Sequence, residues 1–212
     1  MPVILLPLAY LVNVKMVTKP YHHGNLRTEL LDAAVAAIED AGPTALSLRE
    51  LARRVGVTHA APAHHFGDKT GLLTAVAAEG LRLLAADLRA AWERSGSFLE
   101  VGLAYVGFAT RHRAHFEVMF RPELYRVDDP DVAAARDEMT ALLVESAAQV
   151  SDATEGDQAG ALVAGWSLMH GLATLWLNGN LPPDLARDPV ELARRIGVYL
   201  FQASGAAGRA GR

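Results

Sequence analysis

The sequence predicts an all-α protein of about nine helices, with a three-helix helix-turn-helix head followed by a larger helical bundle. From residue 25 onward apolar residues recur at steps of three and four, the spacing that gives a helix one apolar face. Aromatic residues make up only 7% of the chain although 51% of it is hydrophobic, and strand-like runs are scarce. A chain of 212 residues can bury a sizeable core, so we expect one or two globular domains.

Residues 1–20 are expected to be an N-terminal extension outside the core fold. Their apolar run is interrupted by Pro7 and is too short to span a bilayer, and the first lysine, Lys15, follows the run instead of preceding it as in a secretory signal. Either Met16 is the natural start, or the segment is an apolar arm that packs on a neighbour. The absence of cysteine excludes disulfides and thiolate chemistry, and it suits the reducing cytoplasm.

The first helix is predicted to begin near Asn25, with an apolar stripe that includes Leu30 and Ile38. Gly42 suits the left-handed position after a helix, and Pro43 cannot continue one. We therefore expect the first helix to end at this pair.

The second helix is predicted to start at Ser47, in a capping box with Glu50. Gly56 supplies a turn after it, and the small Ala52 lets a following helix cross closely, which is typical of a helix-turn-helix. The same pattern also occurs in helical hairpins that bind nothing.

Later helices are separated by turn-forming segments. Thr58 is expected to cap a third helix over 59–65, and Asp68 a fourth helix that begins at Lys69 and runs to about residue 92. Glycine, proline and acidic residues then divide the chain into helices at about 98–112, 114–120, 132–150, 158–178 and 190–202.

Charge is unevenly distributed along the chain. The formal net charge is -4, yet the first 75 residues carry 7 lysines and arginines against 6 acidic residues, and they hold 5 of the 8 histidines. This mild asymmetry favours a nucleic-acid partner for the first third but does not by itself identify one.

The histidines raise two alternatives, a metal site and an enzyme. A zinc site needs about four converging ligands, whereas the adjacent His64 and His65 point roughly 100° apart on a helix, so we expect no metal. The candidate general bases of an enzyme are His112, His115 and His170, with a carboxylate such as Glu117. No nucleophile elbow, phosphate-binding glycine loop or paired carboxylates accompany them, so we expect neither catalysis nor a cofactor.

Two segments resemble a known family. Residues 21–77, with the sequence YHHGNLRTELLDAAVAAIEDAGPTALSLRELARRVGVTHAAPAHHFGDKTGLLTAVA, resemble the DNA-binding head of the TetR (tetracycline-repressor-like) transcription regulators. Residues 165–181, GWSLMHGLATLWLNGNL, resemble the C-terminal dimerisation segment of the branch named for its Trp-His-Gly signature. The resemblance implies a DNA-binding domain over 21–70, a ligand-binding and dimerisation domain over 71–204 and a flexible tail over 205–212.

The resemblance implies that the third helix enters the major groove of double-stranded DNA. Hydroxyl and imidazole groups can donate to and accept from base edges, and an alanine methyl can contact thymine. Cations and hydroxyls at the starts of helices are expected to bind phosphates. The expected DNA-binding residues are Ser47, Arg49, Thr58, His59, Ala60, His64, Lys69 and, with the arm at 21–23, Arg27.

Two features of the head leave its DNA contacts open. Arg53 and Arg54 are either phosphate contacts or solvated charges on a helix face. Ala63 stands where family members commonly carry tyrosine, so one phosphate-binding hydroxyl is missing, and His64 or His65 would have to replace it. His65 is expected to be a partly buried structural residue beside Phe66.

The middle of the chain is expected to hold a small-molecule effector in an apolar pocket with a few polar groups. Its expected lining is Tyr105, Phe108, His112, Phe116, Met119, Phe120, Trp166, Met169 and His170. The last two helices are expected to form a homodimer interface of four helices. The predicted close-contact stripe on the first of them is Ala161, Gly165, Leu168, Leu172 and Leu175.

These expectations describe a cytoplasmic transcriptional regulator without a membrane partner. We expect a repressor that an effector releases from a palindromic operator. The alternative is a dimeric helical interaction module with the same fold and weak or no specific DNA binding.

Overall fold

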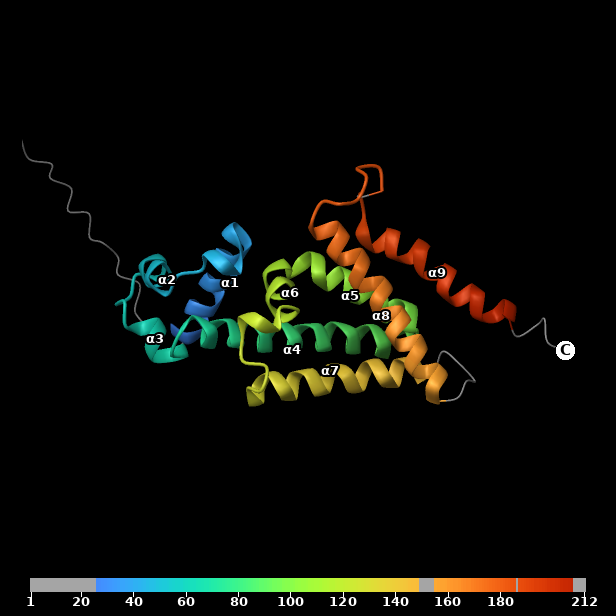
Figure 1. Ribbon diagram of the computed structural model, residues 1–212, viewed down its shortest axis with the longest axis horizontal. Helices are drawn as coiled ribbons and strands as arrows, with labels where there is room; N and C mark the ends of the chain where they lie inside the picture. The colour runs from blue at the N-terminus through green and yellow to red at the C-terminus, as the bar shows by residue number, and fades with distance from the viewer. Residues whose placement is uncertain (1–25, 149–154, 186, 208–212) are drawn as a thin grey trace, which may run out of the picture.

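The computed structural model describes residues 26–148, 155–185 and 187–207 (Figure 1). Within those ranges it contains nine α-helices, one 3₁₀ turn and no strand, which confirms the all-α class. The elements are α1 (Leu26–Ala45), α2 (Leu48–Val55), α3 (Ala61–Phe66), α4 (Lys69–Ser95), α5 (Phe98–Arg111), α6 (Arg113–Met119), η1 (Pro122–Leu124), α7 (Pro130–Ala148), α8 (Glu155–Leu177) and α9 (Pro189–Ala207). The predicted N-terminal extension and the arm at 21–23 lie outside the described residues.

The first three helices pack around a small core. Leu30 of α1, Leu51 of α2 and Phe66 of α3 are buried, and they join the same apolar cluster as the first turns of α4. α1 is broken at Gly42, where φ is 78°. Its straight part therefore ends at Gly42 and Pro43, where the sequence predicts the end of the first helix.

The turn between α2 and α3 depends on Gly56. Its φ of 77° lies in the left-handed region, and its N–H donates to the carbonyl of Arg53 at 3.3 Å. The Val57 N–H donates to the carbonyl of the buried Ala52 at 2.9 Å. The chain therefore reverses over a small side chain, as the helix-turn-helix pattern predicts.

Two of the predicted caps are wrong. Ser47 is the N-cap of α2, but its hydroxyl accepts no bond from the helix, and Glu50 does not reach back because two arginines of α2 hold its carboxylate. Thr58 does not cap α3 with its side chain, since the helix begins at Ala61, whose N–H donates to the Thr58 carbonyl at 3.0 Å. Residues 58–60 therefore form an exposed turn before the helix.

α4 is a single helix of 27 residues that belongs to both halves of the protein. Its first turn packs so closely on α3 that a Cβ at Gly71 would overlap the carbonyl oxygen of Phe66. Further along, Leu84 and Leu88 are fully buried, and α5 and α7 pack on α4 from opposite sides (Figure 1). The helix thus connects the head directly to the bundle.

An ion pair ties the start of α4 to the loop before α7. Asp68 caps α4 as predicted, because its Oδ1 accepts the Gly71 N–H at 2.7 Å. Both of its carboxylate oxygens also accept from Nη2 of Arg126, at 2.9 and 2.8 Å, and the backbone N–H of Arg126 donates to the Thr74 hydroxyl at 3.1 Å. The bond from Gly71, followed by the charge of Arg126, lowers the pKa of Asp68.

Variants of Asp68 separate the cap from the ion pair. Asp68→Ala removes both, whereas Asp68→Asn keeps a capping oxygen and loses only the charge. We expect Asp68→Ala to lower the Tm by roughly 2–4 °C. Asp68→Asn and Arg126→Gln should lower it less, because the pair is exposed to solvent. Thermal unfolding at one fixed protein concentration measures this, and equal losses for all three variants would contradict the capping role.

The C-terminal helices are arranged around α5. α8 crosses α5, and α9 packs on both of them (Figure 1). α9 continues through Ala207, so residues 205–207, predicted to start a flexible tail, are helical; residues 208–212 lie outside the described part. By length and composition alone, Gln158–Leu177 of α8 is apolar enough to cross a membrane, a property that the core helices of soluble proteins share.

Candidate functional site

The turn before α3 presents a group of exposed side chains. The exposed residues of this turn and of α3 are Thr58, His59, Ala60, Ala63 and His64. His65 is partly buried beside Phe66, with ring centroids 6.3 Å apart, which agrees with its expected structural role. The turn therefore offers hydroxyl, imidazole and methyl groups, the chemistry that base edges in a major groove can contact.

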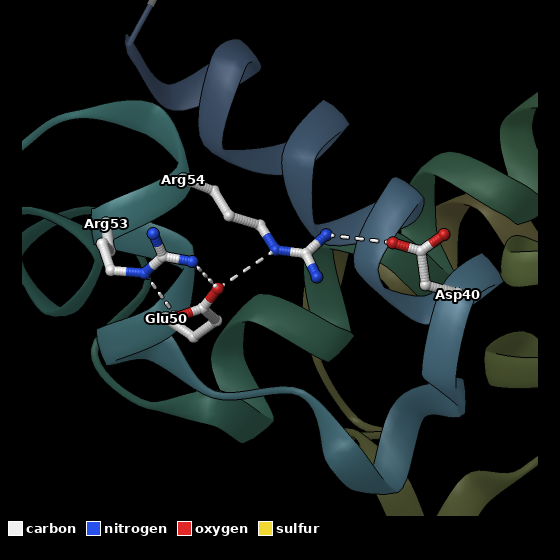
Figure 2. Close-up of polar contacts among 4 residues, drawn as sticks. All are labelled: Asp40, Glu50, Arg53 and Arg54. Carbon is white, nitrogen blue, oxygen red and sulfur yellow. Dashed lines mark hydrogen bonds and ion pairs between the residues drawn. The ribbon is translucent and has the colours of Figure 1, made fainter.

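Two of the three arginines of α2 are neutralised by carboxylates. Arg53 donates to Glu50 from Nε and Nη2, at 2.8 and 2.6 Å, and Nη1 of Arg54 donates to Asp40 of α1 at 3.1 Å. Figure 2 shows Arg54 between the two carboxylates, with its Nε 3.5 Å from Glu50. The bond between Arg53 and Glu50 lowers the pKa of Glu50 and raises that of Arg53. These contacts favour the interpretation of Arg53 and Arg54 as charges on a solvated helix face.

Arg49 is the third arginine, and it has no ion-pair partner among the residues that the structure describes. It is exposed in the first turn of α2, two residues after the Ser47 hydroxyl that makes no capping bond. The free backbone N–H groups and the positive dipole end of α2 lie at the same place. This helix start therefore has the groups that a phosphate requires.

Lys69 and Arg27 are placed differently from each other. The Nζ of Lys69 donates to the carbonyl of Thr44 at 2.6 Å, which brings this ammonium close to the start of α2. The guanidinium of Arg27 lies 5.1 Å from the centroid of the Phe66 ring, and it lines a hollow together with Arg82 of α4. Arg27 therefore lies on the side of the head that faces the bundle.

A second group of polar atoms lies where α5 and α8 cross. The Tyr105 hydroxyl lies 2.8 Å from Nδ1 of His170, and Nε1 of Trp166 donates to the same hydroxyl at 3.3 Å. Since the hydroxyl accepts from the indole, it can donate to His170, which places the proton of a neutral imidazole on Nε2. Phe116 and Phe120 lie with their ring centroids 5.3 and 4.7 Å from that of His170. Aromatic rings thus surround the hydrogen bonds among Tyr105, Trp166 and His170.

Burial keeps the hydrogen-bonded side chains of Tyr105 and His170 uncharged. It raises the pKa of Tyr105, although the Trp166 N–H acts in the opposite direction. It also lowers the pKa of His170, and burial is the largest cause of the lowered pKa of His112 at the α5–α6 junction, ahead of repulsion by His115. At neutral pH both His112 and His170 are therefore neutral in the folded protein.

We expect thermal stability to fall as the pH is lowered from about 7.5 to 5.5. A histidine in the unfolded chain takes up a proton near pH 6.5, whereas His170 in the folded protein resists protonation. The unfolded state then binds more protons in this range, so lower pH favours unfolding. The Tm of His170→Gln should depend less on pH than that of the parent, with the exposed His59→Gln as the control. Identical pH profiles of His170→Gln and the parent would contradict this assignment.

A small cavity of about 20 Å³ lies beside the hydrogen-bonded Tyr105 and Trp166, and it has room for about one water molecule. Three predicted pocket residues line it: Tyr105, Trp166 and Met169. The lining residues that sequence reasoning missed are Phe98, Val101, Gly102, Leu143, Leu162 and Gly165. The sequence held a signal for two of them, Gly102 and Gly165, because a glycine in an otherwise apolar helix marks a place where helices cross closely.

The other predicted pocket residues lie elsewhere. Phe116, Phe120 and His170 form the aromatic layer behind Tyr105. Phe108 is fully buried and stacks on His112, with centroids 4.9 Å apart, and Met119 is buried in α6. The structure therefore does not bring Phe108, His112 and Met119 to the cavity.

One of the three histidines considered as general bases contacts a carboxylate, but not the carboxylate that was proposed from the sequence. The buried His115 places Nε2 2.9 Å from Oε2 of Glu79, and this bond lowers the pKa of Glu79. Glu117, the carboxylate proposed from the sequence, instead accepts from Nε of Arg113 at 2.9 Å. Within the described ranges, no group of three histidine, cysteine or acidic residues can hold a metal ion.

α8 has an outward face of small and apolar residues. This outward α8 face consists of Gly160, Val163, Ala164, Ser167, Gly171 and Leu175. The exposed fractions of Val163 and Leu175 are 57% and 45%, and a Cβ at either glycine would meet nothing within 4 Å. Two of the five residues of the stripe predicted from the sequence face the core of their own chain instead, because Gly165 packs on the Phe98 ring and Leu172 is buried.

Two family profiles match the chain in the order of its two halves. Residues 30–76 match the family described as bacterial regulatory proteins, tetR family, and residues 98–197 match the tetracyclin repressor-like, C-terminal domain. The chain belongs to the TetR family. Among curated relatives, the HTH-type transcriptional regulators BetI of Pectobacterium carotovorum and Serratia proteamaculans are 45% and 41% identical over 49 residues. Each match covers 23% of this chain and only 25% of the relative, so the likeness to these TetR-family members is confined to one segment.

Solved structures extend the likeness to nearly the whole chain. A protein with unknown function from Rhodococcus sp. RHA1 is 33% identical, with a TM-score of 0.74, over 87% of this chain and 98% of that one. The TetR family transcriptional regulator PfmR from Thermus thermophilus is 20% identical, with a TM-score of 0.61, over 82% and 97% of the two chains; it supports the fold alone.

Membership in the TetR family makes this protein a DNA-binding transcriptional regulator. Regulators of this family bind DNA and act as dimers. The exposed turn before α3 lies in the segment that matches the bacterial regulatory proteins of the tetR family, and the crossing of α5 and α8 lies in the segment that matches the C-terminal domain.

Proposed function

We propose that this protein is a cytoplasmic repressor that binds a near-palindromic operator as a homodimer and leaves it when a small-molecule effector binds the C-terminal domain. The observation that carries the DNA-binding part is Arg49 at the exposed start of α2, which has no ion-pair partner in the described part of the chain although its neighbours Arg53 and Arg54 are paired. A free cation at a helix start is available to phosphate at no cost in broken ion pairs.

The proposed DNA interface has two parts. Ser47, Arg49 and Lys69 are clustered by the start of α2 and are assigned to phosphates. Thr58, His59, Ala60 and His64 are exposed on the turn and on α3, and are assigned to the major groove. Arg27 is left as a peripheral contact, because its guanidinium lies against Phe66.

The proposed dimer uses the outward α8 face together with α9. In a two-fold interface each patch meets its own copy, so small residues that let two helices approach closely are favoured. The two open glycines and the exposed valine and leucine of this face fit that requirement.

The proposed effector is uncharged and largely apolar. Tyr105 and Trp166 supply the polar groups of the cavity lining, and no ionisable side chain other than the neutral Tyr105 lines it. A charged ligand would be buried there without a counter-charge, which costs more than hydrogen bonds to one hydroxyl and one indole return. Since the cavity of about 20 Å³ is far below the roughly 300 Å³ of a ligand pocket, binding must open the α5–α8 crossing.

Substitutions of Arg49 and His59 are expected to impair DNA binding in different ways. Arg49→Ala should weaken binding to every DNA sequence and reduce the salt slope by about 1, because it removes one phosphate contact. His59→Ala should instead change the preference at particular base pairs, by about 1–3 kcal/mol. Arg53→Gln, in the same helix but paired with Glu50, is the matched control and should leave both properties nearly unchanged. Fluorescence anisotropy titrations at several salt concentrations separate the three, and equal losses for Arg49→Ala and Arg53→Gln would contradict the assignment.

The experiment that tests the proposed function is a titration of the protein against the DNA upstream of its own coding sequence, with scrambled competitor. Tight, competitor-resistant and salt-dependent binding supports the repressor. Release by uncharged compounds, but not by their carboxylate analogues of equal size, supports the effector class.

The exposed Ala63 favours a second candidate, an interaction module of the same fold with weak DNA binding. If that function is correct, binding is weak and is lost to scrambled DNA. Ala63→Tyr then supplies the hydroxyl and should raise DNA affinity, whereas in a tight repressor it should change affinity little.

A further inference from the structure

A second cavity lies between α4, α5 and α9. It differs in size and in charge from the aromatic cavity, the small one at the α5–α8 crossing. Its volume is about 330 Å³, within the range of small-molecule sites. α4 and α9 both pack on α5, which leaves α5 as the floor between two walls. The floor is formed by Leu103, Ala104 and Gly107, and Val190 of α9 continues this apolar surface.

Three guanidinium groups and two carboxylates line the same cleft. Nη2 of Arg111 lies 2.6 Å from Asp87, and Nη1 of Arg194 lies 2.6 Å from Glu100. Each acid therefore neutralises one arginine, and the bond to Glu100 raises the pKa of Arg194. One positive charge is left over.

The charge left over belongs to Arg94. Its Nη1 donates to the carbonyl of Ala90 at 3.3 Å, and within the described residues it has no ion-pair partner. Its other N–H donors have no acceptor among the residues that the structure describes, and a guanidinium presents them in the fork that fits a carboxylate. Because Arg194 lines the opposite wall, an anion in the cleft is bordered by cations from both α4 and α9.

We infer that this cleft is a second ligand site, which binds a small organic monoanion with an apolar body through Arg94. One unneutralised arginine matches one negative charge, and the apolar floor matches an aryl or alkyl group. A cation is excluded because both acids are already paired. The aromatic cavity and the cleft thus select opposite classes, uncharged molecules at α5–α8 and monoanions at α4–α9.

The site is independent of the proposed dimer contact. Arg194 turns toward Glu100 of α5, so this face of α9 looks into its own chain. The bound anion would join α4, which continues into the DNA-binding head, to α9. Neither operator binding nor an effector at Tyr105 is needed for the cleft to bind its ligand.

The test uses the full-length protein without DNA, with 4-(trifluoromethyl)benzoate and the neutral 4-(trifluoromethyl)benzamide as probes. Fluorine NMR should show benzoate binding at concentrations up to about 10 mM, and benzamide binding should be at least about fivefold weaker. Arg94→Gln should weaken benzoate binding by about fivefold or more. Arg89→Gln, which removes a cation of α4 that pairs with Glu138 outside the cleft, is the matched control and should bind benzoate normally.

A second readout locates the probe. The arginine Nε–H resonance that disappears in Arg94→Gln should shift when benzoate is added to the parent protein. Equal binding of the two probes, equal losses in Arg94→Gln and Arg89→Gln, or no benzoate binding at about 10 mM would each overturn the proposal. Binding that leaves the Arg94 resonance unmoved would also overturn it, because the anion would then lie elsewhere.

Discussion

Val163→Arg is expected to convert the protein from a dimer into a monomer and to abolish tight operator binding. Val163 lies on the outward α8 face with 57% of its surface exposed, so arginine fits without harm to the isolated chain. In a two-fold dimer the substitution occurs twice and buries two unpaired charges at one contact. We expect the dimer dissociation constant to rise by at least about 100-fold.

Light scattering over a dilution series measures the oligomeric state, and anisotropy with the operator measures DNA binding. Val127→Arg is the control, because Val127 is an exposed valine, at 43%, in the loop before α7 and outside the proposed interface. A Val163→Arg variant that stays dimeric would show that the outward α8 face is not the contact. Circular dichroism must show the same helix content in all three proteins.

Phe108→Ala is expected to cost about 3–5 kcal/mol of the free energy of unfolding. Phe108 is 0% exposed in the last turn of α5, so truncation leaves a cavity that the surrounding helices cannot fill completely. A loss of this size is a large part of the stability of a typical domain.

Urea unfolding at one fixed protomer concentration measures this loss, because the stability of a dimer depends on concentration. Val144→Ala, at a position that is 53% exposed, should change the free energy of unfolding by less than about 0.5 kcal/mol. If Phe108→Ala kept its stability and changed only ligand selectivity, Phe108 would be part of the effector site, as its position in the sequence suggested.

The helices were largely predictable because their boundaries are set by local chemistry. Gly42, Gly56 and Gly96 all have positive φ at helix ends, and Asp68 caps the helix that it precedes. The capping box failed for a non-local reason. Glu50 has alternative partners in Arg53 and Arg54, and charged partners compete successfully with a backbone N–H on an exposed helix surface.

The proposed effector site was less predictable, because apolar residues recur at helical spacing both where they line a cavity and where they fill the core. Phe108 and Tyr105 are both buried in α5, yet only Tyr105 borders the cavity. Leu143 of α7 lines the cavity although it is far from Tyr105 and Trp166 in the sequence. On α8 the apolar residues form two faces, and the pattern alone could not tell which face meets the chain's own core and which meets solvent.

The uninterrupted α4 determines how little motion is needed to change the register of the head on DNA. Its 27 residues make a rod of about 40 Å at about 1.5 Å per residue. A tilt of about 5° at the bundle end moves the other end by about 3.5 Å, close to the rise of one base pair. In a symmetric dimer the two rods swing in opposite senses, so the recognition elements separate by about two base-pair steps. If an effector that enters the proposed site at the α5–α8 crossing tilts α4 by this amount, it misaligns both heads of the proposed dimer.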